Sequence, residues 1–127
     1  MIDDQAESLA GLHGVPVAVE IELPLAGIVV ARVHGELDFL TTPAVLRTLR
    51  EQADHATHLV VDVGEVEFMG SSALAMLVAL HDADPAVLHL AGVLNRKVRR
   101  PLEITGLLGL FNTFDTAEDA IAALSTS

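Results

Sequence analysis

The stretch that decides the fold is residues 58–80, HLVVDVGEVEFMGSSALAMLVAL. Its first part, His58 to Val63, is a short apolar run typical of a strand buried on both faces. Gly64-Glu65-Val66-Glu67 predicts a turn, and Phe68-Met69 is a short apolar segment after it. Gly70-Ser71-Ser72 then predicts the start of a second helix that runs to about residue 82. A buried strand that leads into a helix is the unit of an α/β fold with a parallel sheet.

Upstream of this stretch, the pattern predicts two strands and a first helix. Apolar residues occupy every second position from Val15 to Leu23, which predicts a half-exposed strand at a sheet edge. A turn at Pro24 to Gly27 leads to the buried-type strand Ile28–Val33, so the two strands should form a hairpin. Thr42-Pro43 predicts a helix start, with a hydroxyl N-cap before a proline. The inner face of that helix contains four apolar residues: Val45, Leu46, Leu49 and Ala53.

Downstream, strands and helices continue to alternate. The predicted elements are a strand at Ala86–Val93, a helix capped by Asn95 that ends near Gly106 with a kink or late start at Pro101, a short strand at Leu110-Phe111 and a final helix capped by Thr116. The order is therefore β-β-α-β-α-β-α-β-α. It predicts an α/β fold with a mixed, mainly parallel sheet, an N-terminal hairpin and about four helices.

The composition limits the classes of function. The 127 residues include 18 Asp and Glu against 7 Lys and Arg, for a net charge of -11, and no Cys. Disulfides, thiolate metal sites and cysteine nucleophiles are therefore excluded. Strong negative charge repels phosphate backbones and anionic lipid, so nucleic acid and membrane surfaces are poor partners. Neither a Gly-x-x-x-x-Gly-Lys nor a Gly-x-Gly-x-x-Gly motif occurs, and no cofactor is expected.

The sequence also predicts one domain preceded by a tail. Residues 1–13 are polar and acidic and predict a flexible tail, and residues 14–127 predict a single domain. The longest apolar run, Ala73–Leu80, is far shorter than the ~20 residues that span a bilayer. The acidic N-terminus does not resemble a signal peptide, so we expect a cytoplasmic protein.

The second predicted helix is unusual because Ala73–Leu80 has no polar face. Such a helix is either buried between neighbours or leaves an apolar patch for a partner. Ser71-Ser72 precedes it, where hydroxyls can cap the helix. The same position suits a phosphoacceptor, because phosphate would add about -1.5 to -2 of charge beside an apolar docking surface.

Other chemistries have weaker support. A nucleophile elbow at Gly70-Ser71-Ser72, with Asp84 and His89 downstream, lacks the second glycine of Gly-x-Ser-x-Gly in any register. We therefore expect no enzyme activity. Two further groups are candidate metal ligands and one is a candidate anion site, although solvated side chains explain all three: Asp54, His55 and His58; His81, Asp82 and Asp84; and the basic run Arg96-Lys97-Val98-Arg99-Arg100. No metal is expected.

Four motifs in order resemble the STAS domain of anti-sigma-factor antagonists. They are Gly35-Glu36-Leu37-Asp38, the strand His58–Val63, Phe68-Met69-Gly70-Ser71-Ser72-Ala73-Leu74, and the segment from Asn95 to Gly106-Leu107. The resemblance covers nearly the whole chain from Val15. It implies a regulatory protein, not an enzyme.

The resemblance also implies roles for individual residues. Ser71, with Ser72 as the alternative, would be phosphorylated by a serine kinase that doubles as the anti-sigma factor. Asp38 would lie beside that site. The expected contacts with the partner are Asp38, Gly70, Ser72, Ala73, Leu74 and Leu77. Two of them depart from the family pattern, since Gly70 stands where the family usually has Asp and Ala73 where it usually has Gly.

The resulting hypothesis is an antagonist that binds the kinase, frees a sigma factor and is released by phosphate, with a phosphatase as a further partner. The alternative is a STAS module that binds a nucleotide or lipid, or serves a transporter or sensor, without a phosphoswitch.

Overall fold

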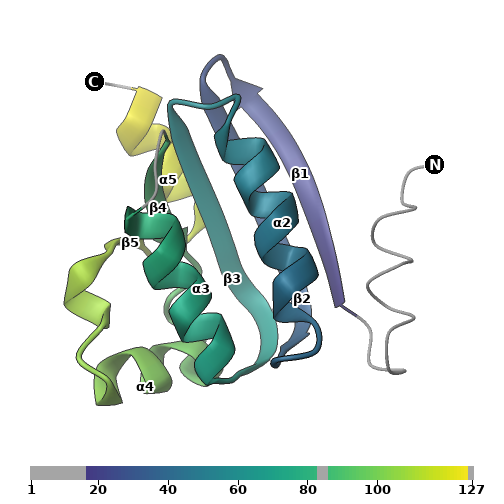
Figure 1. The fold of residues 1–127 in the computed structure, drawn as a ribbon. Helices are drawn as coiled ribbons and strands as arrows, with labels where there is room; N and C mark the ends of the chain where they lie inside the picture. The colour runs from purple at the N-terminus through teal and green to yellow at the C-terminus, as the bar shows by residue number, and fades with distance from the viewer. Residues whose placement is uncertain (1–16, 83–85, 126–127) are drawn as a thin grey trace.

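The computed structural model describes residues 17–82 and 86–125, so the predicted tail at residues 1–13 and Asp84 lie outside the described residues. The elements, coloured along the chain in Figure 1, are β1 (Val17–Leu25), β2 (Ile28–Leu37), α2 (Thr42–Ala53), β3 (His58–Met69), α3 (Ser71–Asp82), β4 (Val87–Ala91), α4 (Arg96–Ile104), a 3-10 turn (Leu108–Leu110), β5 (Asn112–Phe114) and α5 (Ala117–Ser125). The predicted order of strands and helices is confirmed.

One sheet runs through the described part of the chain, in the order β1-β2-β3-β4-β5. β1 pairs with β2 in antiparallel fashion, and every other neighbouring pair is parallel. The mixed, mainly parallel sheet with an N-terminal hairpin is therefore confirmed, with β1 at an edge as expected. The predicted inner face of β1 is only half right, because Ile21 is 36% and Leu23 72% exposed.

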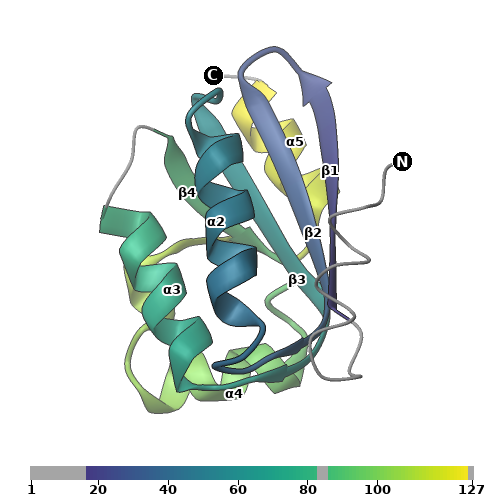
Figure 2. The same ribbon diagram turned by 45° about the vertical axis from the view of Figure 1, so that its right-hand side comes forward.

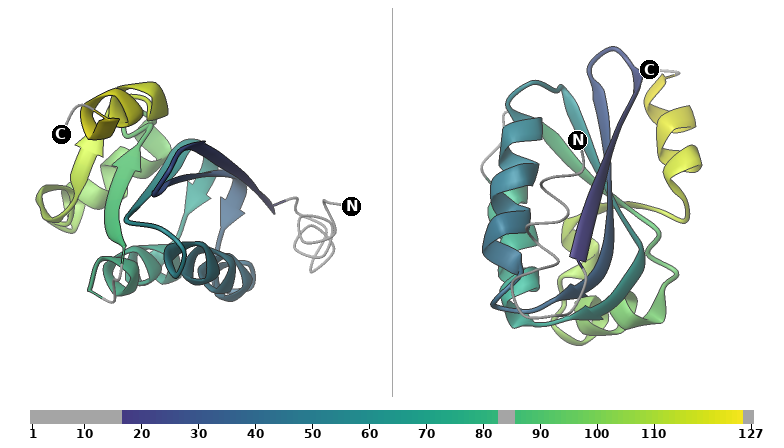
Figure 3. Two further views of the ribbon diagram at one scale, coloured as in Figure 1. Left: turned by 90° about the horizontal axis from the view of Figure 1, so that it is seen from above. Right: turned by 90° about the vertical axis from the view of Figure 1, so that its right-hand side faces the viewer.

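The two faces of the sheet are covered differently (Figures 2 and 3). α2 and α3 lie side by side on one face, which we call the two-helix face, and α5 lies on the other, the one-helix face. The core of the two-helix face includes Leu49 from α2 and Leu77 from α3, with Val61 from β3 beneath them. The core of the one-helix face is smaller: Ile28, Val30, Val60, Ala91, Ala117 and Ala120.

β3 corrects the prediction for residues 64–67. The chain does not turn there: β3 runs from His58 to Met69, with a register shift against β2 between Asp62 and Glu65. Gly64 lies against Gly92 instead, and a Cβ built on Gly92 would lie 2.4 Å from the backbone nitrogen of Gly64. Gly92 itself has a φ of 78°, which favours glycine. The glycines therefore let two chain segments meet beside the sheet, a contact between residues far apart in the sequence.

Two helix and strand boundaries also differ from the prediction, and a third is as predicted. The N-cap of α2 is Thr41, not Thr42, and its side chain makes no capping hydrogen bond. The predicted strand at Leu110-Phe111 is wrong, because the turn at Leu108–Leu110 precedes β5. α4 begins at Arg96 with Asn95 as its cap, so Pro101 does not delay its start. Asn95 Oδ1 accepts a hydrogen bond from the backbone of Lys97 at 3.1 Å, as a cap should.

Candidate functional site

The start of α3 is fixed by Gly70. The Gly70 nitrogen donates to the Leu37 carbonyl at 2.9 Å, which ties the end of β3 to the end of β2. The Gly70 carbonyl accepts hydrogen bonds from the nitrogens of Ala73 at 3.1 Å and Leu74 at 3.2 Å. Gly70 therefore stands at the N-cap position, and Ser71 and Ser72 are the first two residues of the helix. The interpretation of these two serines as capping residues is not supported, because the backbone of Gly70 closes the first turn.

The two serines have different surroundings. Ser72 is half-buried, and its Oγ lies 3.4 Å from Thr42 Oγ1 at the start of α2. Ser71 is exposed, and its hydroxyl makes no hydrogen bond to any described residue. An N-terminal helix position carries partial positive charge from the orphan backbone N–H groups. Ser71 thus presents an accessible hydroxyl at a place that tolerates added negative charge.

Asp38 organises the connection between β2 and α2. Its Oδ1 accepts hydrogen bonds from the nitrogens of Leu40 and Thr41, both at 3.0 Å. The Thr41 hydroxyl accepts from the Asp38 nitrogen at 3.1 Å and donates to the Glu36 carbonyl at 2.8 Å. Asp38 follows Leu37, whose carbonyl holds Gly70, so the backbone at Asp38 lies next to the start of α3.

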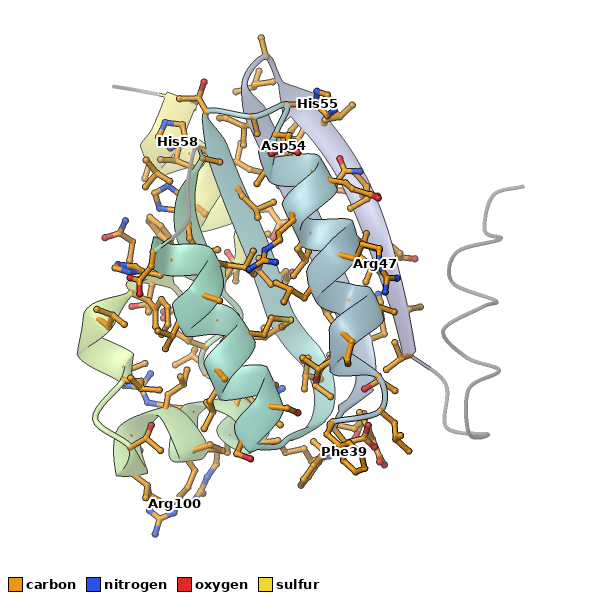
Figure 4. All side chains as sticks on the ribbon, viewed as in Figure 1. Phe39, Arg47, Asp54, His55, His58 and Arg100 are labelled. Atoms are coloured by element: carbon orange, nitrogen blue, oxygen red, sulfur yellow. The ribbon has the colours of Figure 1, made fainter. Side chains whose placement is uncertain are left out.

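This connection carries apolar side chains that the sequence analysis missed. Phe39 is 74% exposed and Leu40 is 50% exposed, and Figure 4 shows Phe39 at the end of the molecule where α2 begins. Phe68 near the end of β3 is 49% exposed. Phe39-Leu40 fits neither a strand nor a helix period, and an apolar pair between Asp38 and a helix start was the signal that could have identified it.

A groove of about 390 Å³ separates α2 from α3 near the same end of the molecule. Phe39 and Ser72 are among the residues that line it, and most of the other lining residues are apolar: Thr42, Pro43, Leu46, Ala75, Met76 and Ala79. The sequence left two possibilities for the apolar helix α3, a buried helix or a helix with an exposed apolar patch, and each is partly right. One side faces the core and the other borders an open groove.

The residues expected to contact a partner fall into a buried group and a group at the start of α3. Ala73 and Leu77 are fully buried, which corrects their assignment, because their side chains pack in the core and cannot meet a partner directly. Leu74 is half-buried and packs against the same core. Gly70 and Ser72 lie at the helix start, with Asp38 on the neighbouring connection.

The basic run on α4 is a solvated face with local ion pairs. Lys97 Nζ lies 2.7 Å from Glu67 on β3, and Arg99 lies 3.1 Å from Glu103 one turn further along the helix. Arg96 and Arg100 are exposed, and Figure 4 shows the Arg100 side chain extending from α4 away from the rest of the molecule. Val98 and Leu102 on the opposite face are buried.

The metal site and the Ser-His pair, the weaker alternatives from the sequence, are not formed among the described residues. No group of three or more His, Asp or Glu there is arranged to hold a metal ion. His89, suggested as a catalytic base, lies beneath α5 on the one-helix face, with its Nε2 3.1 Å from Nδ1 of His58. Burial, and then the neighbouring His58, lower the pKa of His89. The sheet separates it from the helix that Ser71 begins, so a Ser-His pair is not formed.

The sequence and the fold match known proteins. The family model for the STAS domain matches residues 24–120. The anti-sigma-F factor antagonist RsfB of Mycobacterium tuberculosis is 34% identical over 100 residues, which cover 77% of this chain and 82% of that protein. The chain therefore belongs to the STAS-domain family of anti-sigma-factor antagonists.

Solved structures agree with this assignment. The crystal structure of an anti-sigma factor antagonist from Mycobacterium paratuberculosis aligns with a TM-score of 0.74 and 30% identity, over 84% of this chain and 92% of that one. The antagonist SpoIIAA in its unphosphorylated form aligns with a TM-score of 0.71 over 87% of this chain and 98% of that one. At 21% identity, SpoIIAA supports the fold alone.

No helix in the described residues is long and apolar enough to cross a membrane.

Proposed function

We propose that this protein binds an anti-sigma factor with a serine-kinase fold, thereby frees a sigma factor, and is released when Ser71 is phosphorylated. The observation that carries the proposal is the position of Ser71, exposed at the first turn of α3 with no hydrogen bond from its hydroxyl to a described residue. Ser72 is the poorer acceptor because it is half-buried against Thr42.

The chemistry of the step is a phosphoryl transfer. The Ser71 oxygen attacks the γ-phosphorus of ATP held by the kinase, the bond to the β-phosphate oxygen breaks, and ADP leaves. The hydroxyl proton passes to a base of the kinase. A phosphatase would reverse the modification by hydrolysis, so the switch would be reusable.

The surroundings of Ser71 explain how phosphate could release a partner without unfolding the domain. The helix N-terminus stabilises added negative charge, so α3 should remain intact. The neighbouring groove and exposed phenylalanines are apolar, and a dianion beside them would have to lose its water when a partner docks. The phosphorylated surface would therefore bind much more weakly.

The test compares tagged wild-type protein with Ser71→Asp, Ser71→Ala and Ser72→Ala in affinity capture from the native host. We expect wild type and Ser71→Ala to retain an anti-sigma factor and Ser71→Asp to lose it, with at least about a tenfold drop in affinity when the purified partner is titrated. With ATP, wild type and Ser72→Ala should take up phosphate, and Ser71→Ala should not.

If Ser71→Asp binds as tightly as wild type, the proposed switch at Ser71 is contradicted, but the proposed role as an anti-sigma-factor antagonist stands. Capture of no anti-sigma factor by any variant would contradict the function itself. In that case the groove between α2 and α3 would favour the ligand-binding alternative, which mass spectrometry of a lipid or nucleotide retained by the purified protein would detect.

A further inference from the structure

Two histidines and an asparagine are in contact across three neighbouring strands on the one-helix face of the sheet. Nδ1 of His58 on β3 lies 3.1 Å from Nε2 of His89 on β4. The other ring nitrogen of His89, Nδ1, lies 3.4 Å from the side-chain nitrogen of Asn112 on β5. We call these three residues the histidine network. His89 is only 5% exposed, so both nitrogens of a buried ring have side-chain partners.

The amide at one end of the network sets the positions of its protons. An amide nitrogen can only donate, so Nδ1 of His89 accepts from Asn112. The single proton of a neutral His89 ring is therefore on Nε2, which donates to Nδ1 of His58. Because Nδ1 of His58 accepts, the proton of that ring is on Nε2 as well. The hydrogen bonds thus assign the same tautomer to both rings.

This arrangement cannot take up a proton unless Asn112 changes its orientation. A proton added to Nδ1 of His89 would face the N–H of the Asn112 amide, and a proton added to Nδ1 of His58 would face the N–H of His89. Half a turn of the amide removes the conflict, because Oδ1 of Asn112 then accepts from Nδ1 of His89. Asn112 is exposed, so its amide has room to turn. The two rings then share one added proton.

A second proton has no such solution. It would place an N–H on each of the two nitrogens that lie 3.1 Å apart, and two positively charged rings repel each other. His58 is the ring that can move away, because it is half-buried and borders a cavity of about 450 Å³ with Leu124 and Ser125 at the end of α5. His89 is enclosed, and its ring centroid lies 6.1 Å from that of Phe114.

Other charged groups are placed away from the two rings. Among the described residues, those on the surrounding strands and on α5 gather toward the start of that helix: Arg32, Asp62, Asp115, Glu118 and Asp119. Asp54 and His55 are exposed where α2 ends, as Figure 4 shows. Burial, and then His58, lower the pKa of His89. Each ring is therefore the charged neighbour that opposes a second proton on the other.

We infer that the histidine network is a pH-sensitive switch for the end of α5, in which a first proton reverses the Asn112 amide and a second separates His58 from His89. The ion pair of Glu118 with Arg32 holds the start of α5, and the apolar cluster beneath this helix is small. The end of α5 is therefore the part that separation of the rings releases first. The network lies across the sheet from Ser71, so this inference does not depend on the proposed function.

The experiment records nitrogen-15 NMR spectra of the full-length wild-type protein from about pH 8 down to about pH 4.5. Imidazole nitrogen shifts report the tautomer and charge of each ring, and the side-chain amide signals of Asn112 report its reversal. We expect Nε2–H on both rings at high pH and a change at Asn112 with the first proton. With the second proton, the backbone order parameters of residues 121–124 should fall from about 0.85 to below about 0.6. His34, which pairs with Glu20 at 3.0 Å outside the network, is the internal control.

A matched pair of variants tests the role of Asn112. Asn112→Asp places a carboxylate against Nδ1 of His89, so the ring should bind its proton at least about tenfold more tightly than in wild type. Thr113→Asp adds the same charge at the next, equally exposed position of β5, which points to the opposite face of the sheet, and should have little effect. His58→Gln removes the repulsion, so α5 should stay ordered at the low pH that loosens it in wild type.

Four results would overturn the inference. An Nδ1–H tautomer of His89 at high pH would contradict the assigned direction of the hydrogen bonds. Equal effects of Asn112→Asp and Thr113→Asp would show a general effect of charge. Loss of order in wild type and His58→Gln at the same pH would show that the two rings do not control α5. A wild-type domain that unfolds as a whole before the second proton binds would have no local switch.

Discussion

The two faces of the sheet are stabilised in different ways, one mainly by apolar packing and the other with a larger share of ion pairs. On the two-helix face, apolar side chains from α2, α3 and four strands form one continuous core. On the one-helix face, the apolar cluster beneath α5 is small, and Arg32 adds ion pairs to it. The helix that begins with Ser71 therefore lies over the better packed face.

Arg32 shows how the one-helix face is held. Its guanidinium lies 2.7 Å from Asp62, 3.1 Å from Glu22 and 3.5 Å from Glu118, so one side chain links β1, β2, β3 and α5. The hydrogen bond to Glu22 is the main cause that raises the pKa of Arg32, which keeps it charged. Asp62 uses its other oxygen to accept a bond from the Gly64 nitrogen at 2.9 Å. Such partly exposed pairs contribute less than apolar burial.

The largest expected loss of stability comes from a substitution in the core of the two-helix face. Leu77 is fully buried, so Leu77→Ala should lower the free energy of unfolding by about 2–5 kcal/mol through lost burial and the remaining cavity. Urea denaturation followed by circular dichroism measures it. A cost below about 1 kcal/mol would mean that α3 is not a core helix and would restore Leu77 as a candidate partner contact.

A matched pair on one strand sharpens the comparison. Val60 and Val61 are adjacent in β3, and both have 0% exposure, but Val60 faces α5 and Val61 faces the two-helix core. Val61→Ala should cost about 2–3 kcal/mol and Val60→Ala about 1–2 kcal/mol, because the short helix α5 can move to fill the space. Denaturation of the two variants side by side gives the difference. Equal costs would show that both faces are packed to the same tightness.

The smallest effect is a pH dependence that belongs to the one-helix face. The pKa of His89 is lowered, first by burial and then by His58, from its ordinary value of 6.5. The unfolded chain therefore takes up this proton at a higher pH than the folded chain. Stability is fully present above the ordinary value and falls as the pH drops through it toward the lowered pKa.

The control for this effect is His89→Gln, which retains a polar side chain but cannot titrate. Unfolding free energies of both proteins, measured by urea at several pH values on either side of the ordinary pKa of His, should show the steeper decrease in wild type. Parallel curves would mean that His89 takes up its proton equally easily in the folded chain.

Much of the fold could be predicted from the sequence, and the reasons are local. Asn95 and Thr116 cap their helices as expected, with Oγ1 of Thr116 accepting from the Asp119 nitrogen at 3.0 Å. The residues involved are two or three positions apart, so the pattern contains the whole interaction. The pattern also predicted the Ser71-Ser72 pair at a helix start, and α3 does begin at Ser71. The role of Ser71 as a phosphoacceptor stays a prediction.

The errors have a common cause, because each involves residues distant in the chain. Gly64 was interpreted as a turn since its contact with Gly92 cannot be seen in a local window. Leu77 was placed at the partner surface because a helix that is apolar all round gives no sign of which side is buried. The exposure of Phe39 and Phe68 was missed for the same reason, since no period identifies an apolar residue that the neighbouring elements leave uncovered.

The sequence by itself determined the order of strands and helices, the hairpin and the hydroxyl at the start of α3, because period, capping and turn chemistry act over a few residues. Only the tertiary structure decided that β3 continues to Met69, that Ser71 rather than Ser72 is exposed, and that Phe39 and Phe68 are left uncovered. Those features depend on which segments meet across the sheet, and burial is set by neighbours that are far apart in the chain.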